Sequence, residues 1–385
     1  MDHIVVVGAS AAGLTAAETL RRQGFAGTVT VLGDELHLPY DRPPLSKQIL
    51  AGAWEPERAT LREDAHLQRL RLNLELGCRV AHVSSAARTV TLADGEQLRY
   101  DGLIIATGLR PRRLPFGHDL AGVHVLRTLD DALTLRAQLL AGPRVVVVGA
   151  GFLGSEIAAT ARGLGLDVSL VDVESAPLAR QVGTWAGGLV ADMHRDQGVR
   201  LHMGRSVVGF LGDNRVAAVV LDDETRLPAD VVVVAIGSVP AVDWLADSGI
   251  PAGDGVLCDS TCRAAPGVYA AGDVANWPHL VTGGRGRLEQ RANATEQAMA
   301  AAKNLLVGPA GAVDYTPIPF GWTDQYDTKI QTYGWCPDGA EVKVVDGDPR
   351  DRKFVALHYT DGRVVGALGW NSPRALRQHR GRIAE

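Results

Sequence analysis

Short, uninterrupted apolar runs recur along the chain and predict buried parallel strands, because a strand that is covered on both faces does not alternate with polar residues. One pattern of strand, glycine-rich turn, helix and strand occurs twice, at residues 4–7, 13–22 and 28–32 and again at 144–148, 154–163 and 168–171. Two further apolar runs, at 103–108 and 231–237, each end in glycine. A repeated β-α-β unit of this kind predicts two Rossmann-like nucleotide-binding domains in an α/β fold.

The pattern changes after residue 316, where apolar and polar residues alternate. The segments KFVALHY and RVVGALGW read as two strands joined by a turn at Asp361 and Gly362, since Asp-Gly is a favoured hairpin turn. This predicts a small α+β C-terminal domain that is rich in strands.

The second β-α-β unit carries the stronger nucleotide-binding motif. Gly149, Gly151 and Gly154 form G-x-G-x-x-G between the predicted strand and helix. The first glycine permits a tight turn, the second lets backbone approach a pyrophosphate, and the third lets helix and strand pack closely. Asp172 ends the next strand, where its carboxylate can accept both ribose hydroxyls and repels a 2′-phosphate, and no Arg follows it directly. We therefore predict that NADH is preferred over NADPH.

The first unit has Gly8, Ser10 and Gly13, with Ser in the middle position. Serine is small enough to permit close approach of a phosphate. The acidic partner is Asp34 or Glu35, and position favours Asp34. The alternative is that this acidic pair belongs to a solvated turn.

Composition is that of an ordinary globular protein. The chain has 385 residues, 46% of them hydrophobic, and a formal net charge of −5, which argues against a nucleic-acid binder. No apolar run is long enough for a membrane span, and residues 2 and 3 lack the basic start of a signal peptide, so we expect a cytoplasmic protein. The histidines and the four cysteines show no metal-ligand spacing, so no metal site is expected.

Several motifs together make the whole chain resemble one family. They are, in chain order, GASAAG, YDRPPLSK (residues 40–47), ATGLRPRRLP, GAGFLGSE, GVYAAGDVA, FGWTDQY and NSPR. The set resembles the FAD-dependent NADH:ferredoxin reductases, such as putidaredoxin reductase, rubredoxin reductase and the reductases of ring-hydroxylating dioxygenases. Apoptosis-inducing factor is a more distant relative. RPPLSK is more specific to this branch than the glycine turns are.

The resemblance implies a glutathione-reductase-like FAD/NAD(P) fold. It implies an FAD-binding domain (residues 1–108 and 244–315) that is interrupted by an NAD-binding domain (109–243), followed by a C-terminal domain (316–385) that packs on the flavin. The residues implied to contact FAD are Gly8, Ser10, Ala12, Gly13, Asp34, Arg42, Lys47, Val80, Ala106, Thr107, Gly108, Arg127, Gly272, Asp273, Glu289, Arg291, Ala292 and Trp322. Those implied to contact NAD are Gly149, Gly151, Phe152, Leu153, Gly154, Glu156, Asp172, Ala235, Ile236 and Gly237.

The same resemblance places two candidate catalytic residues. It puts Lys47 beside the flavin N5 region and Glu156 beside the nicotinamide, where the two side chains could pair. A lone buried charge is costly, so pairing is the sensible arrangement. Lys47 would stabilise negative charge on reduced flavin, and Glu156 would position the carboxamide for hydride transfer. The alternative is a surface lysine and an ordinary helix glutamate.

Two positions depart from the family pattern. Arg291 stands where many relatives have Trp, and Gly321 replaces an aromatic residue beside Trp322. Both are expected near the flavin edge, where they would affect access or partner docking.

The resulting hypothesis is an enzyme that takes hydride from NADH onto flavin N5 and passes electrons singly to a [2Fe–2S] ferredoxin. The ferredoxin would feed a haem-thiolate monooxygenase or a ring-hydroxylating dioxygenase. One rival is an NADH-sensing flavoprotein of the apoptosis-inducing-factor type. Another is a peroxide or disulfide reductase that uses Cys258 and Cys262, although their position favours a packing role. Arginine clusters at 110–113, 285–287 and 374–382 are candidate contacts for an acidic ferredoxin.

Overall fold

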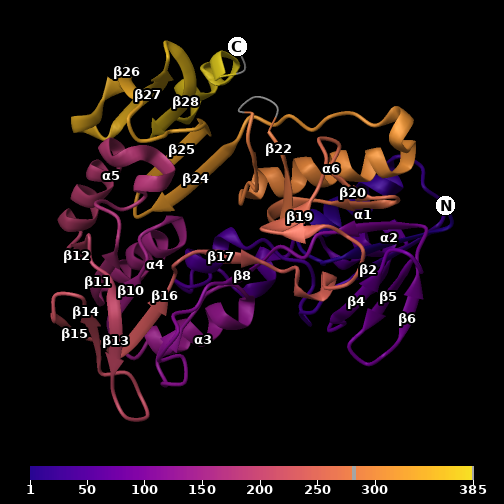
Figure 1. The fold of residues 1–385 in the computed structure, drawn as a ribbon. Coiled ribbons are helices and arrows are strands. Elements are labelled where there is room, and N and C mark those ends of the chain that lie inside the picture. Colours follow the sequence, from indigo (N-terminus) through magenta and orange to yellow (C-terminus); the bar gives the residue numbers. More distant parts are fainter. Residues whose placement is uncertain (280–282, 384–385) are drawn as a thin grey trace. The chain divides into compact units, whose positions relative to one another are not determined.

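The computed structural model describes residues 1–279 and 283–383, and Figure 1 shows its elements in chain order. The chain divides into two compact units. Unit 1 comprises Met1–Asp41, Ala59–Arg110 and Val239–Pro317; unit 2 comprises Arg42–Arg58, Pro111–Ser238 and Ile318–Glu385. The segment that carries most of YDRPPLSK thus groups with unit 2.

Unit 1 is built on a sheet whose central strands are parallel and apolar. In the described residues this sheet has the order β20-β21-β7-β1-β2-β3, with only β20 antiparallel to its neighbour. The strands are β1 (His3–Val7), β2 (Thr28–Leu32), β3 (Asn73–Glu75), β7 (Gly102–Ile105), β20 (Arg263–Ala265) and β21 (Val268–Ala270). Val5 of β1 lies opposite Thr30 on one side and Leu103 on the other, so β1 is an inner strand, and its residues 4–7 are buried.

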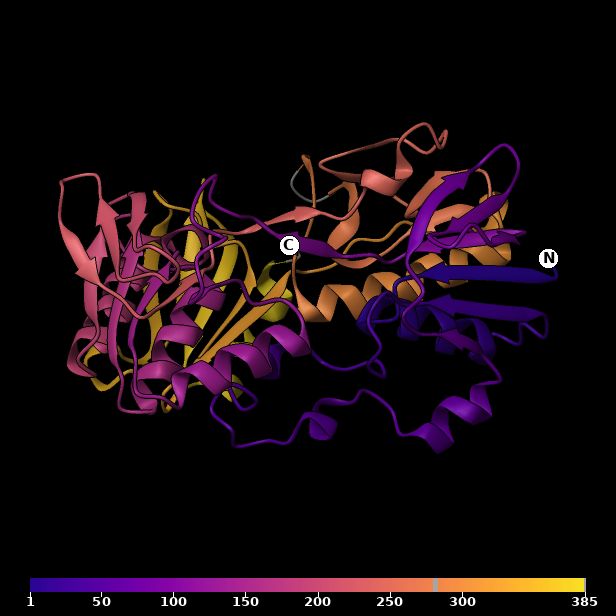
Figure 2. The same ribbon diagram turned by 90° about the horizontal axis from the view of Figure 1, so that it is seen from below.

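Two helices of unit 1 pack against each other, α1 (Ala11–Arg22) and α6 (Arg291–Val307). Figure 2 shows α6, in orange, beside the indigo N-terminal segment. Alanines on α6, such as Ala298, Ala301 and Ala302, join the same core as the apolar strands.

The smaller elements of unit 1 form two further sheets and one short helix. One sheet has the order β4-β5-β6 and the other β18-β19-β22-β23 in the described ranges. Their bounds are β4 (Val80–Ser84), β5 (Thr89–Leu92), β6 (Gln97–Arg99), β18 (Ala252–Gly253), β19 (Gly255–Leu257), β22 (Ala275–Pro278), β23 (Arg285–Gly286) and α2 (Asp64–Leu70). Short strands β8 (Leu109–Pro111) and β17 (Ser238–Pro240) pair where the chain passes between the units.

Unit 2 repeats the parallel β-α-β design. Its parallel sheet has the order β12-β11-β10-β16-β9, and a separate antiparallel sheet has the order β13-β14-β15. The bounds are β9 (Val123–His124), β10 (Arg144–Val148), β11 (Asp167–Asp172), β12 (Arg200–Met203), β13 (Val207–Leu211), β14 (Ala218–Leu221), β15 (Arg226–Pro228) and β16 (Val231–Val234). The helices are α3 (Leu129–Leu139), α4 (Phe152–Gly163) and α5 (Ala179–Asp196).

The C-terminal part of unit 2 is an antiparallel sheet with the order β24-β25-β28-β27-β26. Its elements are β24 (Phe320–Gln325), β25 (Thr328–Gly334), β26 (Glu341–Asp348), β27 (Lys353–Thr360), β28 (Arg363–Trp370) and α7 (Pro373–Gln378). Asp361 and Gly362 both have positive φ, 50° and 75°, which is the geometry of a two-residue type I′ hairpin turn. The predicted turn is therefore confirmed.

One face of this C-terminal sheet packs on α5 and completes a core that neither part has alone. Val182, Ala186 and Val190 of α5 lie against Phe354 and Trp370 of the sheet, and Figure 1 shows the sheet, in yellow, next to α5. Asp338 also accepts a hydrogen bond from Thr184 N at 2.6 Å, just after the non-helical Gly183 interrupts α5. The part of unit 2 that contains the parallel sheet and the C-terminal part thus form one compact unit.

The predicted strands and the observed ones largely coincide, but the two motif helices begin two residues earlier than predicted. Ser10 and Gly151 are the N-caps of α1 and α4. Gly13 and Gly154 therefore lie inside the first turns, not at the helix starts. The predicted strands at 103–108 and 231–237 were also too long. β7 ends at Ile105 and β16 at Val234, and Gly108 and Gly237 have φ of +65° and +90°, a backbone conformation that leaves the sheet.

No helix in the described part of the chain has the length and apolar character needed to cross a membrane.

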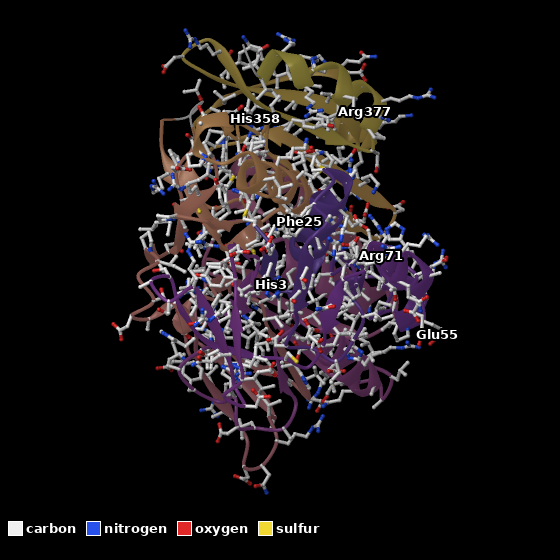
Figure 3. The ribbon with its side chains drawn as sticks, turned by 90° about the vertical axis from the view of Figure 1, so that its right-hand side faces the viewer. His3, Phe25, Glu55, Arg71, His358 and Arg377 are labelled. Atoms are coloured by element: carbon white, nitrogen blue, oxygen red, sulfur yellow. The ribbon has the colours of Figure 1, made fainter. Side chains whose placement is uncertain are left out.

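The C-terminal sheet contains a buried histidine. His358 of β27 is 1% exposed, Figure 3 labels it within the sheet, and neither ring nitrogen has a partner among the described residues. Burial lowers the pKa of His358 to about 4. The unfolded chain, with an ordinary histidine pKa near 6.5, therefore binds more protons than the folded chain between about pH 6.5 and pH 4.

We expect the free energy of unfolding to fall with pH in that window, by up to ~1.4 kcal/mol per pH unit from this site. Urea titrations at pH 7 and pH 5 of the wild type and of His358→Leu measure it. The variant should lose less stability on acidification than the wild type. An equal loss in both proteins would contradict the assignment.

Candidate functional site

The two glycine-rich turns have the same geometry, one in each unit. Gly8 has a φ of +111°, and a Cβ there would lie 2.2 Å from the carbonyl oxygen of Ala106. Gly149 has a φ of +101°, and a Cβ there would lie 2.3 Å from the carbonyl oxygen of Ala235. Only glycine fits at either position, since the conformation disfavours other residues and a neighbouring carbonyl occupies the space.

The third glycine of each motif lets the first helical turn lie directly on the glycine turn. A Cβ on Gly13 would come within 1.7 Å of the oxygen of Gly8, and one on Gly154 within 1.8 Å of the oxygen of Gly149. Neither α1 nor α4 has an acidic residue in its first turn or a side-chain cap. Each helix N-terminus thus presents backbone N–H groups and a positive dipole end to an anion.

The middle position shows that these turns fit a dinucleotide. A Cβ on Gly151 would meet only Gln181 Nε2, at 3.6 Å, so packing within the protein does not require glycine there. Its missing side chain leaves the helix N-terminus accessible, as the approach of a pyrophosphate requires. Ser10 occupies the equivalent place in unit 1, and its side chain does not cap α1.

The predicted ribose-binding carboxylates lie at the ends of the second strands. Asp172 ends β11, and its carboxylate accepts hydrogen bonds from Ala150 N in the glycine turn and from Glu174 N at 2.9 Å. Asp34 follows β2 and is exposed. Glu35, the other candidate, accepts a hydrogen bond from the Tyr40 hydroxyl.

The loop that carries Asp273 lies beside the first helix of unit 1. A Cβ on Gly272, whose φ is +77°, would meet Ala12 at 3.1 Å and Ala294 at 3.6 Å. Gln297 of α6 accepts a hydrogen bond from Gly272 N at 2.9 Å. Unit 1 thus brings Gly8, Ala12 and Gly272 together, as a site for FAD would require.

The other FAD candidates of unit 1 have varied environments. Thr107 donates to Ala241 O at 2.9 Å, Val80 begins β4, and Glu289 accepts from Arg287 at 2.7 Å. Arg291, the first residue of α6, pairs with Asp41 and donates to Thr295 Oγ1 at 2.5 Å. The departure at Arg291 therefore fastens Asp41 to α6 within unit 1.

The predicted pair of Lys47 and Glu156 is confirmed in unit 2. Lys47 Nζ lies 2.7 Å from Glu156 Oε2, and the two side chains are 11% and 8% exposed. Lys47 follows the 3₁₀ turn Pro43–Ser46, and Glu156 lies in α4. Arg42 of the same segment donates to Arg127 O at 2.6 Å, so two more FAD candidates meet within this unit.

Sequence reasoning missed three hydroxyl residues around Glu156. Ser46 Oγ donates to Glu156 Oε2 at 2.5 Å, and Thr323 Oγ1 donates to Oε1 at 2.8 Å. Thr160, one helical turn beyond Glu156, donates to Ser46 O at 2.7 Å. Ser46 lies inside the quoted motif RPPLSK, but nothing in the sequence indicates that residue 323 approaches residue 156.

Trp322 points to the opposite face of β24 from Thr323 because side chains alternate along a strand, and it stacks on Phe320.

The cysteines have the environment of packing residues. Cys258 and Cys262 are 2% and 0% exposed, and both thiols are free. Burial raises the pKa of Cys258 to about 12 and also raises that of Cys262. Such thiols are poor nucleophiles.

The described residues contain no cluster of His, Cys, Asp and Glu that could hold a metal ion.

Comparison with known proteins identifies the class to which this fold and these turns belong. Residues 2–298 match the pyridine nucleotide-disulphide oxidoreductase family, and residues 320–385 match the reductase C-terminal family. The chain belongs to the pyridine nucleotide-disulphide oxidoreductase family and carries the reductase C-terminal domain.

Two curated relatives and one solved structure make this more specific. The chain is 39% identical over 377 residues to the ferredoxin–NAD(+) reductase component of the biphenyl dioxygenase system of Paraburkholderia xenovorans (strain LB400), covering 97% of this chain and 91% of that protein. It is 36% identical to rhodocoxin reductase of Rhodococcus erythropolis, covering 96% and 87%. The structure of the covalent putidaredoxin reductase–putidaredoxin complex aligns with a TM-score of 0.93 and 32% identity, covering 99% of this chain and 93% of that one.

These findings confirm the predicted family, the fold class and the cofactors. The chain is an FAD-dependent oxidoreductase that uses NADH. The structural likeness to a persulfide reductase, at 23% identity, shows the common fold alone. The roles of the individual site residues stay predictions.

An arginine that sequence reasoning overlooked bears on the choice of nicotinamide. Arg180 lies at the start of α5 and pairs with Glu174 at 2.6 Å, with 71% and 33% of the two side chains exposed. Glu174 therefore adds negative charge beside Asp172. It also forms an ion pair with the Arg180 guanidinium, which could otherwise bind a 2′-phosphate.

We expect Glu174→Gln to raise kcat/KM for NADPH by roughly three- to thirty-fold while changing that for NADH less than two-fold, since one repulsive charge is lost and Arg180 is released. Steady-state kinetics with both nucleotides measures this. Glu341→Gln is a matched control, because Glu341 also forms an exposed ion pair, with Lys343 at 3.0 Å. A gain that is equal in both variants would refute the local role of Glu174.

Proposed function

We propose that this chain is the NADH:ferredoxin reductase of an oxygenase system. The observation that carries this proposal is a likeness over nearly the full length, C-terminal domain included, to reductases whose names specify ferredoxin as the partner. The electrons would pass through a [2Fe–2S] ferredoxin to a haem-thiolate monooxygenase or a ring-hydroxylating dioxygenase. We place the protein in the cytoplasm, where NADH is available.

The residues around each glycine turn would hold the two cofactors. In unit 1, Gly8, Ser10 and the N-terminus of α1 would receive the FAD pyrophosphate, and Asp34 the adenosine ribose. In unit 2, Gly149, Gly151 and the N-terminus of α4 would do the same for NADH, with Asp172 at its ribose. When bound, FAD supplies the conversion between two-electron transfer from NADH and one-electron transfer to an iron–sulfur centre.

Lys47 and Glu156 have the strongest claim to a role in the reaction itself. Lys47 brings a positive charge that would stabilise negative charge developing nearby, and the mostly buried setting strengthens such an interaction. Glu156 would accept a hydrogen bond from the carboxamide and so orient the nicotinamide. Their ion pair holds both groups in place.

The arginines near the C-terminus are the best candidates for recognition of an acidic ferredoxin. Arg374, Arg377 and Arg380 have exposed side chains, and Figure 3 shows Arg377 projecting from the C-terminal part of the chain. In the other predicted clusters, Arg110 pairs with Asp243, and Arg285 donates to Cys258 O and Asn276 O at 2.9 Å. Complementary charge accelerates the encounter of such proteins.

The direct test is reduction of cytochrome c by NADH and the purified holoenzyme, with and without a bacterial [2Fe–2S] ferredoxin. We expect a strong increase in rate when ferredoxin is present, at low ionic strength above all, because charge steers the encounter. The assay is repeated with several ferredoxins, so that a negative result does not come from a single non-cognate partner. Reduction of the flavin by NADH with no transfer to any of them, together with NADH-dependent dimerisation, would replace the proposal with the signalling alternative.

A separate prediction concerns the disulfide-reductase alternative. With a pKa of about 12 for Cys258, only ~1 thiol in 10,000 is ionised at pH 8. We expect iodoacetamide to leave Cys258 and Cys262 unmodified in the native enzyme, before and after reduction by NADH, and to modify both in urea. Mass spectrometry of peptides measures this. Rapid labelling that appears only after NADH is added would contradict the packing role.

A further inference from the structure

Both oxygens of the Glu156 carboxylate are held by donors from separate segments of unit 2. Oε2 accepts from Lys47 Nζ at 2.7 Å and from Ser46 Oγ at 2.5 Å. Oε1 accepts from Thr323 Oγ1 at 2.8 Å. The first two donors come from the RPPLSK turn, whereas the third comes from β24 of the C-terminal sheet.

An ionised carboxylate can only accept, so the Thr323 hydroxyl donates to Glu156. The next residue on the same face of β24 supports that hydroxyl. Gln325 Nε2 lies 3.2 Å from Thr323 Oγ1, and an amide nitrogen can only donate. Thr323 Oγ1 therefore accepts from Gln325, which leaves its own proton for Glu156. Thr323 and Gln325 are 0% and 1% exposed, so water does not compete with either bond.

We propose that Thr323, supported by Gln325, is a positioning residue for Glu156. Lys47 and Ser46 both act on Oε2, so without Thr323 the carboxylate would keep one anchored oxygen and could turn about it. Thr323 fixes the second oxygen and hence the plane of the carboxylate. This inference rests on the proposed role of Glu156 in orienting the nicotinamide, and it gives the C-terminal domain a part in that orientation.

Burial alone does not account for a threonine at this position. A valine has nearly the same shape, and burying a hydroxyl costs free energy unless it is hydrogen-bonded. Here the hydroxyl bonds to a carboxylate that already has an ion-pair partner. Its distinctive contribution is therefore geometric, since the charge of Glu156 is already balanced by Lys47.

The test compares Thr323→Val, which removes only the hydroxyl, with Thr323→Ser, which retains it. Thr332→Val is a matched control, since Thr332 is a buried threonine on the neighbouring strand β25. Glu156→Gln reports on the proposed role of Glu156 itself. For each holoenzyme three quantities are measured: the anaerobic single-turnover rate of flavin reduction by NADH, the dissociation constant of NAD⁺, and the Glu156 conformation in a crystal structure.

We expect Thr323→Val to slow single-turnover reduction about tenfold, because misorientation of a reacting group costs rate more than binding. Its NAD⁺ dissociation constant should change less than two-fold, and its Glu156 carboxylate should rotate. Thr323→Ser and Thr332→Val should stay within two-fold of the wild-type rate.

Two outcomes would overturn the inference while leaving the proposed function intact. One is a wild-type rate and an unmoved Glu156 in Thr323→Val when Glu156→Gln is slow. The other is equal slowing in Thr323→Val and Thr332→Val, which would mark a general loss of packing. A wild-type rate in Glu156→Gln would instead refute the proposed role of Glu156, and the inference with it.

Discussion

The arrangement of unit 2 depends on satisfying one mostly buried carboxylate. Glu156 lies in the first two turns of α4, 8% exposed at the side chain, where an uncompensated charge would be costly. Compensation comes from the RPPLSK turn and from the C-terminal sheet, which are far from α4 in sequence and from each other. The need to satisfy this group ties three distant segments together. Together with the bonds from Arg42 to Arg127 O and from Thr160 to Ser46 O, these contacts join Arg42–Arg58 to unit 2.

The two glycine turns show how one steric constraint serves two ligands. In both units the first glycine lacks a side chain that would clash with a backbone carbonyl at the end of the neighbouring strand. The third glycine lacks a side chain that would clash with the carbonyl of the first. These contacts shape the turn regardless of what binds there. In the proposed function, the ligand is distinguished by what lies around the turn: Asp172 and Glu174 in unit 2, Ala12 and the Gly272 loop in unit 1.

The C-terminal sheet has two structural roles that its sequence pattern alone does not reveal. Its alternating strands and its Asp361-Gly362 turn were predictable, because a strand buried on one face must alternate and a type I′ turn needs two residues with positive φ. Its packing partner was not. Phe354 and Trp370 contact α5, and Thr323 reaches Glu156 of α4, so this sheet completes the core and the candidate site of the part that precedes it.

The sequence by itself determined the repeated β-α-β units, their glycine turns and the choice of family, because these follow from local periodicity, backbone sterics and motifs of contiguous residues. It also suggested the pairing of Lys47 with Glu156, through a resemblance. Only the tertiary structure decided that Ser46, Thr160 and Thr323 gather around that pair. Contacts between segments more than a hundred residues apart leave no periodic signal along the chain. They arise only when folding brings a buried charge and its donors together.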